Sequence, residues 1–283
     1  MRILLLVLVG ALALAVPASR APPSVPRFTH VVVVVFENRE STDVIGSADA
    51  PTFNALAARG AVLSNYDGVA HPSLPNYLAL VSGSTHGIVD DCTDCSVDAR
   101  SLADTLPARG RTWKTYAEGL PSAGFTGAFA GRYTKKHNPF AYFDNVGANA
   151  AMRRRIVPYA QLARDVRARK LPSFALVVPD RCNDMHDCPV ATGDAWLKAN
   201  IVPLLASKAL AGGVVFVVFD EGTSDLGGGG HVAAIAVGPR VRPGSRYTAP
   251  TNHYGLLRTI ESAWGLPLLG HSASAKPITG IWR

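Results

Sequence analysis

The chain has 283 residues, of which 48% are apolar and 17% are charged, and its formal net charge is +7. This composition excludes a disordered chain, because enough apolar side chains are present to build a core. No polar linker divides the sequence after residue 30, so one large domain is expected. The positive charge favours anionic partners such as phosphorylated molecules.

The N-terminal residues have the pattern of a cleaved signal peptide. Arg2 precedes a continuous apolar run over residues 3–16, and small residues follow. The run is shorter than the about 20 residues of a membrane-spanning helix, and an uncleaved anchor is the alternative. We expect a signal peptide at residues 1–21, a Pro-rich linker at residues 22–29 and a single domain at residues 30–283. The protein is therefore expected to be secreted or periplasmic.

Apolar runs and helical patterns alternate along the rest of the chain. The expected strands, two of them weak, are residues 31–36, 61–66, 112–117, 174–178, 214–219 and 232–237. The expected helices are residues 51–59, 75–82, 101–109, 159–169, 194–210 and 254–264. Alternation of this kind predicts an α/β fold, with a mostly parallel central sheet and helices on both of its faces.

Polar side chains follow the strongest expected strands. Glu37 and Asn38 come directly after the first strand, and Asp220 and Glu221 come directly after residues 214–219. Ligands of open parallel sheets bind beyond the carboxyl ends of the strands. Crowded carboxylates repel each other unless a cation lies between them, so these four residues predict a site for Mg²⁺, Ca²⁺ or Mn²⁺. Taken singly, each of them could equally cap a helix or lie in a surface loop.

The loop after residues 174–178 adds further candidate ligands. Asp184 and His186 lie there, and together they could extend the site toward Zn²⁺ or a second metal. The number and identity of the metals stay open at this stage.

The segment from His71 to Tyr77 contains a candidate nucleophile. Pro75 fits the first turn of a helix, which puts Ser73 just ahead of that helix. The free N–H groups at a helix start stabilise an anion. Ser73, deprotonated beside a metal, could attack phosphorus and form a phosphoserine. The alternative is that Ser73 only caps the helix, and His71 is an uncertain member of the site.

Four other histidines are candidates of unequal standing. His137 follows two lysines, His186 lies in an acidic loop, and His253 begins the last expected helix. Each could bind phosphate oxygens or protonate a leaving group. His231 follows four glycines that form a candidate flap, and its role stays open. The glycine run does not fit a P-loop, because no Gly-Lys-Ser/Thr follows it.

The cysteines and arginines bear on two further questions, namely disulfide formation and the kind of partner that the protein binds. Cys92 and Cys95 lie close together, as do Cys182 and Cys188, and in an oxidising compartment we favour these two local disulfides over a four-cysteine zinc site. Arginines are densest at residues 153–170, a pattern typical of a solvated helix face. We expect no nucleic-acid partner and at most peripheral membrane contact.

Together these motifs resemble the bacterial phosphoesterase family of the alkaline phosphatase superfamily. That family contains secreted acid phosphatases, including mycobacterial ones that act on phosphoinositides, and phospholipases C. The resemblance covers nearly all of the mature chain, in the segments 36–41, 71–77, 136–140, 183–187, 193–197, 220–222 and 253–254. The segment Ser-Leu-Pro-Asn-Tyr at 73–77, with residues 82–83 and 86–88, also resembles the region around the threonine nucleophile of nucleotide pyrophosphatases.

The resemblance implies roles for individual residues. Ser73 would attack, and Asn76 stands where the pyrophosphatases have an asparagine that touches the phosphoryl oxygen. The residues implied as metal ligands are Glu37, Asn38, Asp220 and Glu221, and those implied to contact the phosphoryl group or leaving oxygen are Asn76, His137, His186 and His253. Glu221 replaces the aspartate or histidine of several relatives, which leaves the metal content open.

The expected function is that of an exported acid phosphatase acting on phosphate monoesters, including phosphoinositides. The chain is short beside phospholipases C, which favours monoesters over diesters. A phosphodiesterase or phospholipase C with the same site is one alternative. A non-catalytic protein that binds anionic lipid or phosphate is the other.

Overall fold

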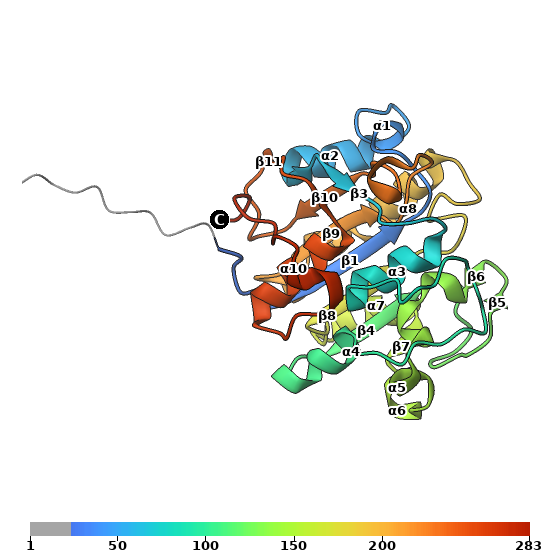
Figure 1. The fold of residues 1–283 in the computed structure, drawn as a ribbon. Helices are drawn as coiled ribbons and strands as arrows, with labels where there is room; N and C mark the ends of the chain where they lie inside the picture. Colours follow the sequence, from blue (N-terminus) through green and yellow to red (C-terminus); the bar gives the residue numbers. More distant parts are fainter. Residues whose placement is uncertain (1–23) are drawn as a thin grey trace, which may run out of the picture.

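The computed structural model describes residues 24–283, so the expected signal peptide and the first linker residues lie outside the described part. The fold is built on an eight-stranded sheet with the order β11-β2-β10-β9-β1-β8-β4-β7 (Figure 1). Its strands are β1 (Val31–Phe36), β2 (Ala61–Leu63), β4 (Trp113–Ala117), β7 (Ile156–Pro158), β8 (Phe174–Val178), β9 (Val214–Phe219), β10 (Ala234–Val237) and β11 (Ser245–Tyr247).

Burial on both faces explains the composition of the central strands. β1, β8 and β9 contain only apolar residues, mostly valine, and all of these residues are buried. β1 pairs in parallel with β8 on one side and with β9 on the other. The expected mostly parallel sheet is confirmed, although β10 runs antiparallel to both β9 and β2.

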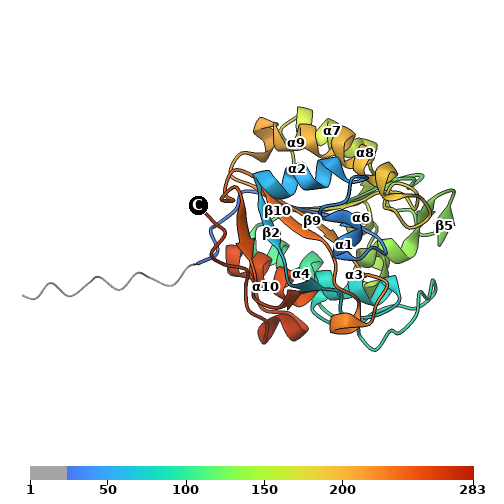
Figure 2. The ribbon, with the colours of Figure 1, turned by 90° about the horizontal axis from the view of Figure 1, so that it is seen from above.

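Helices cover both faces of this sheet (Figure 2). One layer contains α2 (Pro51–Arg59), α7 (Ala160–Arg167), α8 (Val190–Asn200) and α9 (Val202–Leu205). The other contains α3 (Ser73–Ser82), α4 (Leu102–Thr105) and α10 (His253–Trp264). The short elements are α1 (Ser41–Val44), α5 (Asp144–Gly147), α6 (Ala150–Arg153) and the pairs β3 (Tyr66–Asp67) with β12 (Thr251–Asn252) and β5 (Phe129–Ala130) with β6 (Tyr133–Thr134).

Three expected helices differ from the structure, and the one over residues 101–109 is divided into α4 and a 3-10 turn at Pro107–Arg109. The expected helix over residues 194–210 is wrong at its start and in its continuity, because α8 begins at Val190 and the chain breaks near Ile201 before α9. Pro203 follows that break, and proline cannot donate the backbone hydrogen bond that would continue α8. The expected helix over residues 75–82 begins two residues earlier, so Ser73 is the first residue of α3 rather than the residue ahead of it.

The cysteines form two local disulfides, Cys92–Cys95 and Cys182–Cys188. The expected pairings are confirmed, and the alternative of a four-cysteine zinc site is wrong because no thiol is left to bind a metal. Both disulfides lie in long loops, one after α3 and one after β8. Within residues 24–283, no helix has the length and apolar character needed to cross a membrane.

Candidate active site

The three central strands end side by side, and the acidic residues that follow them meet at that edge of the sheet. Glu37, after β1, and Asp220 and Glu221, after β9, offer oxygens within 4.8 Å of one another. Asp184 comes from the loop after β8, and its backbone carbonyl accepts the N–H of Glu37 at 2.8 Å. All four side chains are at most 4% exposed. Parallel order therefore brings distant parts of the sequence into one buried acidic group.

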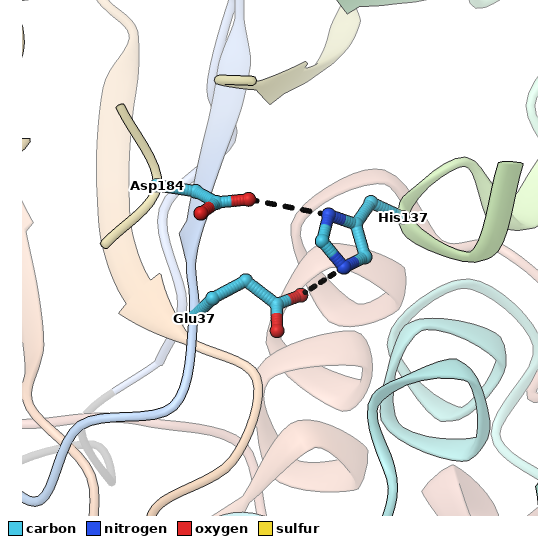
Figure 3. A group of neighbouring side chains, drawn as sticks. All are labelled: Glu37, His137 and Asp184. Atoms are coloured by element: carbon cyan, nitrogen blue, oxygen red, sulfur yellow. Dashed lines mark ion pairs between the residues drawn. The ribbon is translucent and has the colours of Figure 1, made fainter. Parts of the chain in front are cut away.

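His137 lies between two of these carboxylates, as Figure 3 shows. Its Nε2 is 2.9 Å from Oε1 of Glu37, and its Nδ1 is 3.2 Å from Oδ2 of Asp184. Its ring stacks on Tyr77 of α3, with the two ring centroids 5.2 Å apart. Burial alone would lower the pKa of His137, but the two carboxylates outweigh it and raise this pKa to about 9. We call Glu37, His137 and Asp184 the inner cluster.

The two carboxyl groups of the inner cluster titrate differently. Burial acts to raise the pKa of Glu37, but the charges of His137 and Lys136 lower it to about 2. Burial raises the pKa of Asp184 to about 6, helped by the charge of Glu37 and opposed by His137. Glu37 is therefore the fixed negative charge of the site near neutral pH.

Glu37, Asp220 and Glu221 form what we call the outer cluster. Burial and then the charges of Glu37 and Glu221 raise the pKa of Asp220 well above its ordinary value. Burial and the charge of Glu37 also raise the pKa of Glu221, although His71 opposes this, with its Nδ1 2.5 Å from Oε2 of Glu221. A divalent cation between the three carboxylates would remove this repulsion.

Unsatisfied buried atoms show that both clusters fit a metal ion. Oε1 of Glu37, Nε2 of His137, Oδ2 of Asp184 and Oδ2 of Asp220 are buried and form no hydrogen bond. The 2.9 Å contact between Glu37 and His137 does not have hydrogen-bond geometry. Buried polar atoms nearly always have partners, so these four are candidate ligand atoms. Carboxylate oxygens suit Mg²⁺, Ca²⁺ or Mn²⁺, and the imidazole of the inner cluster adds a ligand typical of Zn²⁺.

Asn38 lies at the same edge and has a strained backbone. Its φ is 52°, in the left-handed region that few non-glycine residues adopt. Its N–H lies 3.4 Å from Oδ1 of Asp220, and this contact connects the end of β1 to the end of β9. The backbone of Asn38 thus helps to orient a carboxylate of the outer cluster.

Ser73 is 1% exposed and contacts both clusters. Its Oγ is 2.9 Å from Oε2 of Glu37 and 3.1 Å from Oε1 of Glu221, and Nζ of Lys136 lies 3.4 Å from it. The hydroxyl has one proton, so it can donate to only one of the two carboxylates at a time. A serine between proton acceptors and candidate metal ligands has the surroundings that activate a hydroxyl nucleophile.

Two residues of the site were not expected from the sequence. Asp91 accepts the N–H of Leu74 at 3.0 Å through Oδ1, and its Oδ2 lies 2.8 Å from Nζ of Lys136. The place of Lys136 beside His137 was an available signal. Nothing in the local sequence marks Asp91, which comes from the disulfide-containing loop after α3.

Asn76 is directed at the backbone rather than at the Ser73 hydroxyl. Its Oδ1 accepts the N–H groups of Val69 and Ala70 at 2.8 and 3.2 Å. Its Nδ2 donates to the carbonyls of Ala70 and Pro72 at 2.7 and 3.3 Å. Both the oxygen and the nitrogen of the side-chain amide are thus engaged by the backbone. Asn76 therefore fixes the conformation of the segment that precedes Ser73.

His253 is also buried away from the hydroxyl. It contacts the Tyr66 hydroxyl at 2.9 Å and the backbone carbonyl of Asp220 at 2.5 Å. Burial lowers the pKa of His253 to about 4, so it is neutral near pH 7. Its contact with Asp220 supports the backbone of the outer cluster.

Asp184 and His186, named together as candidate ligands, have different partners in the structure. The side chain of Asp184 faces His137 and also accepts the backbone N–H of His186 at 2.8 Å. The His186 ring is partly exposed and pairs with Asp187 at 2.7 Å. Met185, between them, has a φ of 80°, and the centre of the His186 ring lies 6.2 Å from the centre of the His137 ring.

The glycine-rich loop after β9 is attached at both ends. The carboxylate of Glu40 accepts the N–H groups of Thr223, Ser224 and His231 at 2.9, 2.9 and 3.1 Å. His231 also pairs with Asp67, at 2.9 Å. These contacts hold the loop beside His71, whose Nε2 lies 3.0 Å from the Ser224 carbonyl.

A large cavity between α2 and α8 lies away from this chemistry. It has a volume of about 590 Å³ and is lined mainly by short apolar side chains with Arg59 and Lys198 among them. None of its lining residues contacts Ser73. We therefore identify the candidate site by its buried ionisable groups rather than by the volume of a cavity.

Comparisons with known proteins identify the family of the chain. The model of the Phosphoesterase family matches residues 46–267. A Phosphatidylinositol-3-phosphatase of Mycobacterium tuberculosis is 36% identical over 93% of this chain and 85% of its own length. A probable acid phosphatase of Kluyveromyces lactis is 33% identical over 86% of this chain, which spans only 60% of that protein.

Solved structures with the same fold are much less similar in sequence. A protein of the alkaline phosphatase superfamily from Vibrio parahaemolyticus has a TM-score of 0.59 and 14% identity, over 91% of this chain and 72% of that one. The murine ectonucleotide pyrophosphatase/phosphodiesterase 5 has a TM-score of 0.57 and 13% identity, over 86% of this chain and 96% of that one. The chain therefore belongs to the Phosphoesterase family and is a phosphatase-type hydrolase with an alkaline-phosphatase-like fold.

Proposed function

We propose that the protein is an exported acid phosphatase that hydrolyses phosphate monoesters through a phosphoserine on Ser73, with the assistance of bound divalent metal. One observation carries this proposal. The Ser73 hydroxyl, at the start of α3, lies 2.9 Å from Glu37 and 3.1 Å from Glu221 within a buried group of metal-binding side chains. The two disulfides support export, because disulfides persist in oxidising compartments.

The proposed reaction has two steps. Ser73 Oγ attacks phosphorus and its proton passes to Oε1 of Glu221, which lies 3.1 Å away and whose raised pKa makes it a better base than Glu37. The bond to the ester oxygen breaks, and the leaving oxygen takes a proton from the partly exposed His186 or from water. Water then attacks the phosphoserine, the bond between phosphorus and Oγ breaks, and Ser73 regains a proton as inorganic phosphate leaves.

Metal binding is assigned to the two clusters. Asn38 with the outer cluster would hold one ion, and the inner cluster would hold a second. Bound metal would supply Lewis acidity, which lowers the pKa of the hydroxyl and stabilises charge on the phosphoryl oxygens. The raised pKa of Asp220 and the unsatisfied buried atoms support this assignment, because both are what a site built around a cation would have.

We propose a small phosphorylated molecule or a phosphoinositide headgroup as the substrate, with membrane contact at most peripheral. The support is the Mycobacterium tuberculosis relative named Phosphatidylinositol-3-phosphatase, which aligns over 93% of this chain. The net charge of +7 also favours a polyanionic substrate.

The first experiment compares hydrolysis of p-nitrophenyl phosphate by the mature protein and its Ser73→Ala variant. Ser96→Ala, on an exposed position, is the matched control. We expect Ser73→Ala to lose activity while it keeps its circular dichroism spectrum, and intact mass spectrometry of acid-quenched wild type to show one added phosphoryl group. Equal activity in both proteins would remove Ser73 as the nucleophile. Turnover of bis(p-nitrophenyl) phosphate alone would replace the monoesterase by a diesterase. Phosphate binding without turnover would favour the non-catalytic alternative.

A further inference from the structure

Lys136 supplies a positive charge in an otherwise acidic contact shell around Ser73. It lies in the short helical turn Lys135–His137, and its side chain is only 16% exposed. The other two side chains that hydrogen-bond the Ser73 hydroxyl, among the described residues, are the carboxylates of Glu37 and Glu221. A phosphoryl group that reached Ser73 would meet those two negative charges as well as the Lys136 ammonium.

Phosphate monoesters and diesters differ in the charge that they bring to such a site. Near pH 7 a monoester carries between −1.5 and −2 charges, because its second pKa is about 6. A diester has one ionisable oxygen fewer and carries about one negative charge at the same pH. A fixed cation beside the nucleophile therefore stabilises a bound monoester more than a bound diester.

Asp91 fixes the position of this cation. Its carboxylate bridges Nζ of Lys136 and the N–H of Leu74, the residue after the nucleophile. This bridge holds the lysine at the start of α3, where helix N–H groups also favour an anion. A lysine has four rotatable side-chain bonds, so without such a partner its charge would be spread over many positions.

We propose that Lys136 determines the preference of this site for phosphate monoesters over diesters, with Asp91 as its positioning residue. The inference rests on the proposed function, because it takes Ser73 as the nucleophile. Lys136 touches the phosphoryl oxygen that carries the additional charge of a monoester. Loss of one oriented hydrogen-bond donor typically lowers the rate of a reaction roughly 100-fold. Removal of Lys136 should therefore lower the rate of monoester hydrolysis by about this factor, and the rate of diester hydrolysis much less.

Lys135 provides a matched control in the same helical turn. Its Nζ donates to the Thr93 carbonyl at 2.8 Å and lies 4.2 Å from the centre of the Tyr142 ring. It thus contacts the same loop as Lys136 but not Ser73. Lys135→Met and Lys136→Met remove the same charge from adjacent positions, so only the contact with the site differs between them.

The experiment measures kcat/KM at pH 7 for p-nitrophenyl phosphate and bis(p-nitrophenyl) phosphate in wild type and both variants. We expect Lys136→Met to lower the monoester value about 100-fold and the diester value less than about 10-fold, and Lys135→Met to change both by less than about threefold. Lys136→Arg should recover part of the monoester preference. Asp91→Asn should lower the ratio of monoester to diester kcat/KM by a smaller factor than Lys136→Met does. For the monoester, its effect on kcat should be larger than its effect on KM.

A binding measurement separates this inference from the proposed function. Isothermal titration of wild type and Lys136→Met with inorganic phosphate and with dimethyl phosphate needs neither turnover nor a serine nucleophile, and Lys136→Gln replaces a Met variant that fails to fold. A drop of about 10-fold or more in affinity for inorganic phosphate alone supports the role of Lys136, even if Ser73→Ala stays active. Equal losses of affinity for both ligands and of kcat/KM for both substrates would overturn the inference, and so would the absence of any loss.

Discussion

The inner and outer clusters share Glu37 but differ in how their negative charge is balanced. The inner cluster has an imidazole between its two carboxylates, within 2.9 and 3.2 Å. The outer cluster has three carboxylates, and the half-buried His71 touches it only through Glu221. Accordingly, the pKa of Glu37 falls to about 2 beside His137, while burial and like charges raise the pKa of Asp220. Burial is nearly complete in both, so the arrangement of neighbouring charges decides which way each pKa moves.

The largest effect is expected from Glu37→Gln, because Glu37 belongs to both clusters and its Oε2 lies 2.9 Å from the Ser73 hydroxyl. This change should lower kcat/KM for p-nitrophenyl phosphate about 1000-fold or more while the protein stays folded. Steady-state kinetics and circular dichroism provide the measurement. Full activity in the variant would show that neither cluster depends on Glu37.

Asp220→Asn and Asp184→Asn separate the two clusters. Asp220→Asn should remove metal from the outer cluster and lower activity about 100-fold, and Asp184→Asn should weaken metal binding at the inner cluster with a smaller loss. Metal content after dialysis, measured by inductively coupled plasma mass spectrometry, reports each site directly. Asp98→Asn, an exposed carboxylate, serves as the control. Identical metal loss in both site variants would mean that the clusters form a single site.

A smaller effect is expected at the edge of the outer cluster. His71→Gln removes the ring that holds Oε2 of Glu221 at 2.5 Å, and loss of such a supporting partner typically lowers activity 10- to 100-fold. His231→Gln breaks a similar pair with Asp67 that does not touch the site, and should change kcat/KM less than about threefold. Comparable losses in the two variants would mean that the histidines support the loop rather than Glu221.

Glu261 tests what burial does to a carboxyl group without like-charged neighbours. It lies in α10 and accepts hydrogen bonds from Leu269 N–H and Ser272 Oγ, yet burial raises its pKa to about 7. Because the folded pKa exceeds the ordinary 4.5, its contribution to stability is complete below pH 4.5 and is lost as the pH rises through 7. Relative to Glu261→Gln, wild type should lose about 3 kcal/mol of unfolding free energy between pH 4 and 8. Urea unfolding at several pH values measures this difference, and parallel curves for the two proteins would contradict it.

The sequence predicted the structure best in the central strands, where an apolar run corresponds to a strand buried on both faces. Valine-rich runs predict β1, β8 and β9 with their observed bounds, because strands buried on both faces must be apolar throughout. Residues directly after those strands were predicted to meet, since parallel strands bring their carboxyl ends to one edge. Short edge strands such as β7 and β11 have no such pattern and were not expected.

The sequence by itself determined the fold class and the edge of the sheet at which Glu37, Asn38, Asp220 and Glu221 would meet, and it favoured the two local disulfides. Only the tertiary structure decided which side chains face each other there. It places Asp184 against His137, and it brings Asp91 to Lys136. It also engages the side-chain amide of Asn76 in hydrogen bonds with backbone groups. The reason is physical: apolar periodicity and strand order are encoded locally, whereas contacts between loops depend on backbone turns and on charges from segments far apart in the chain.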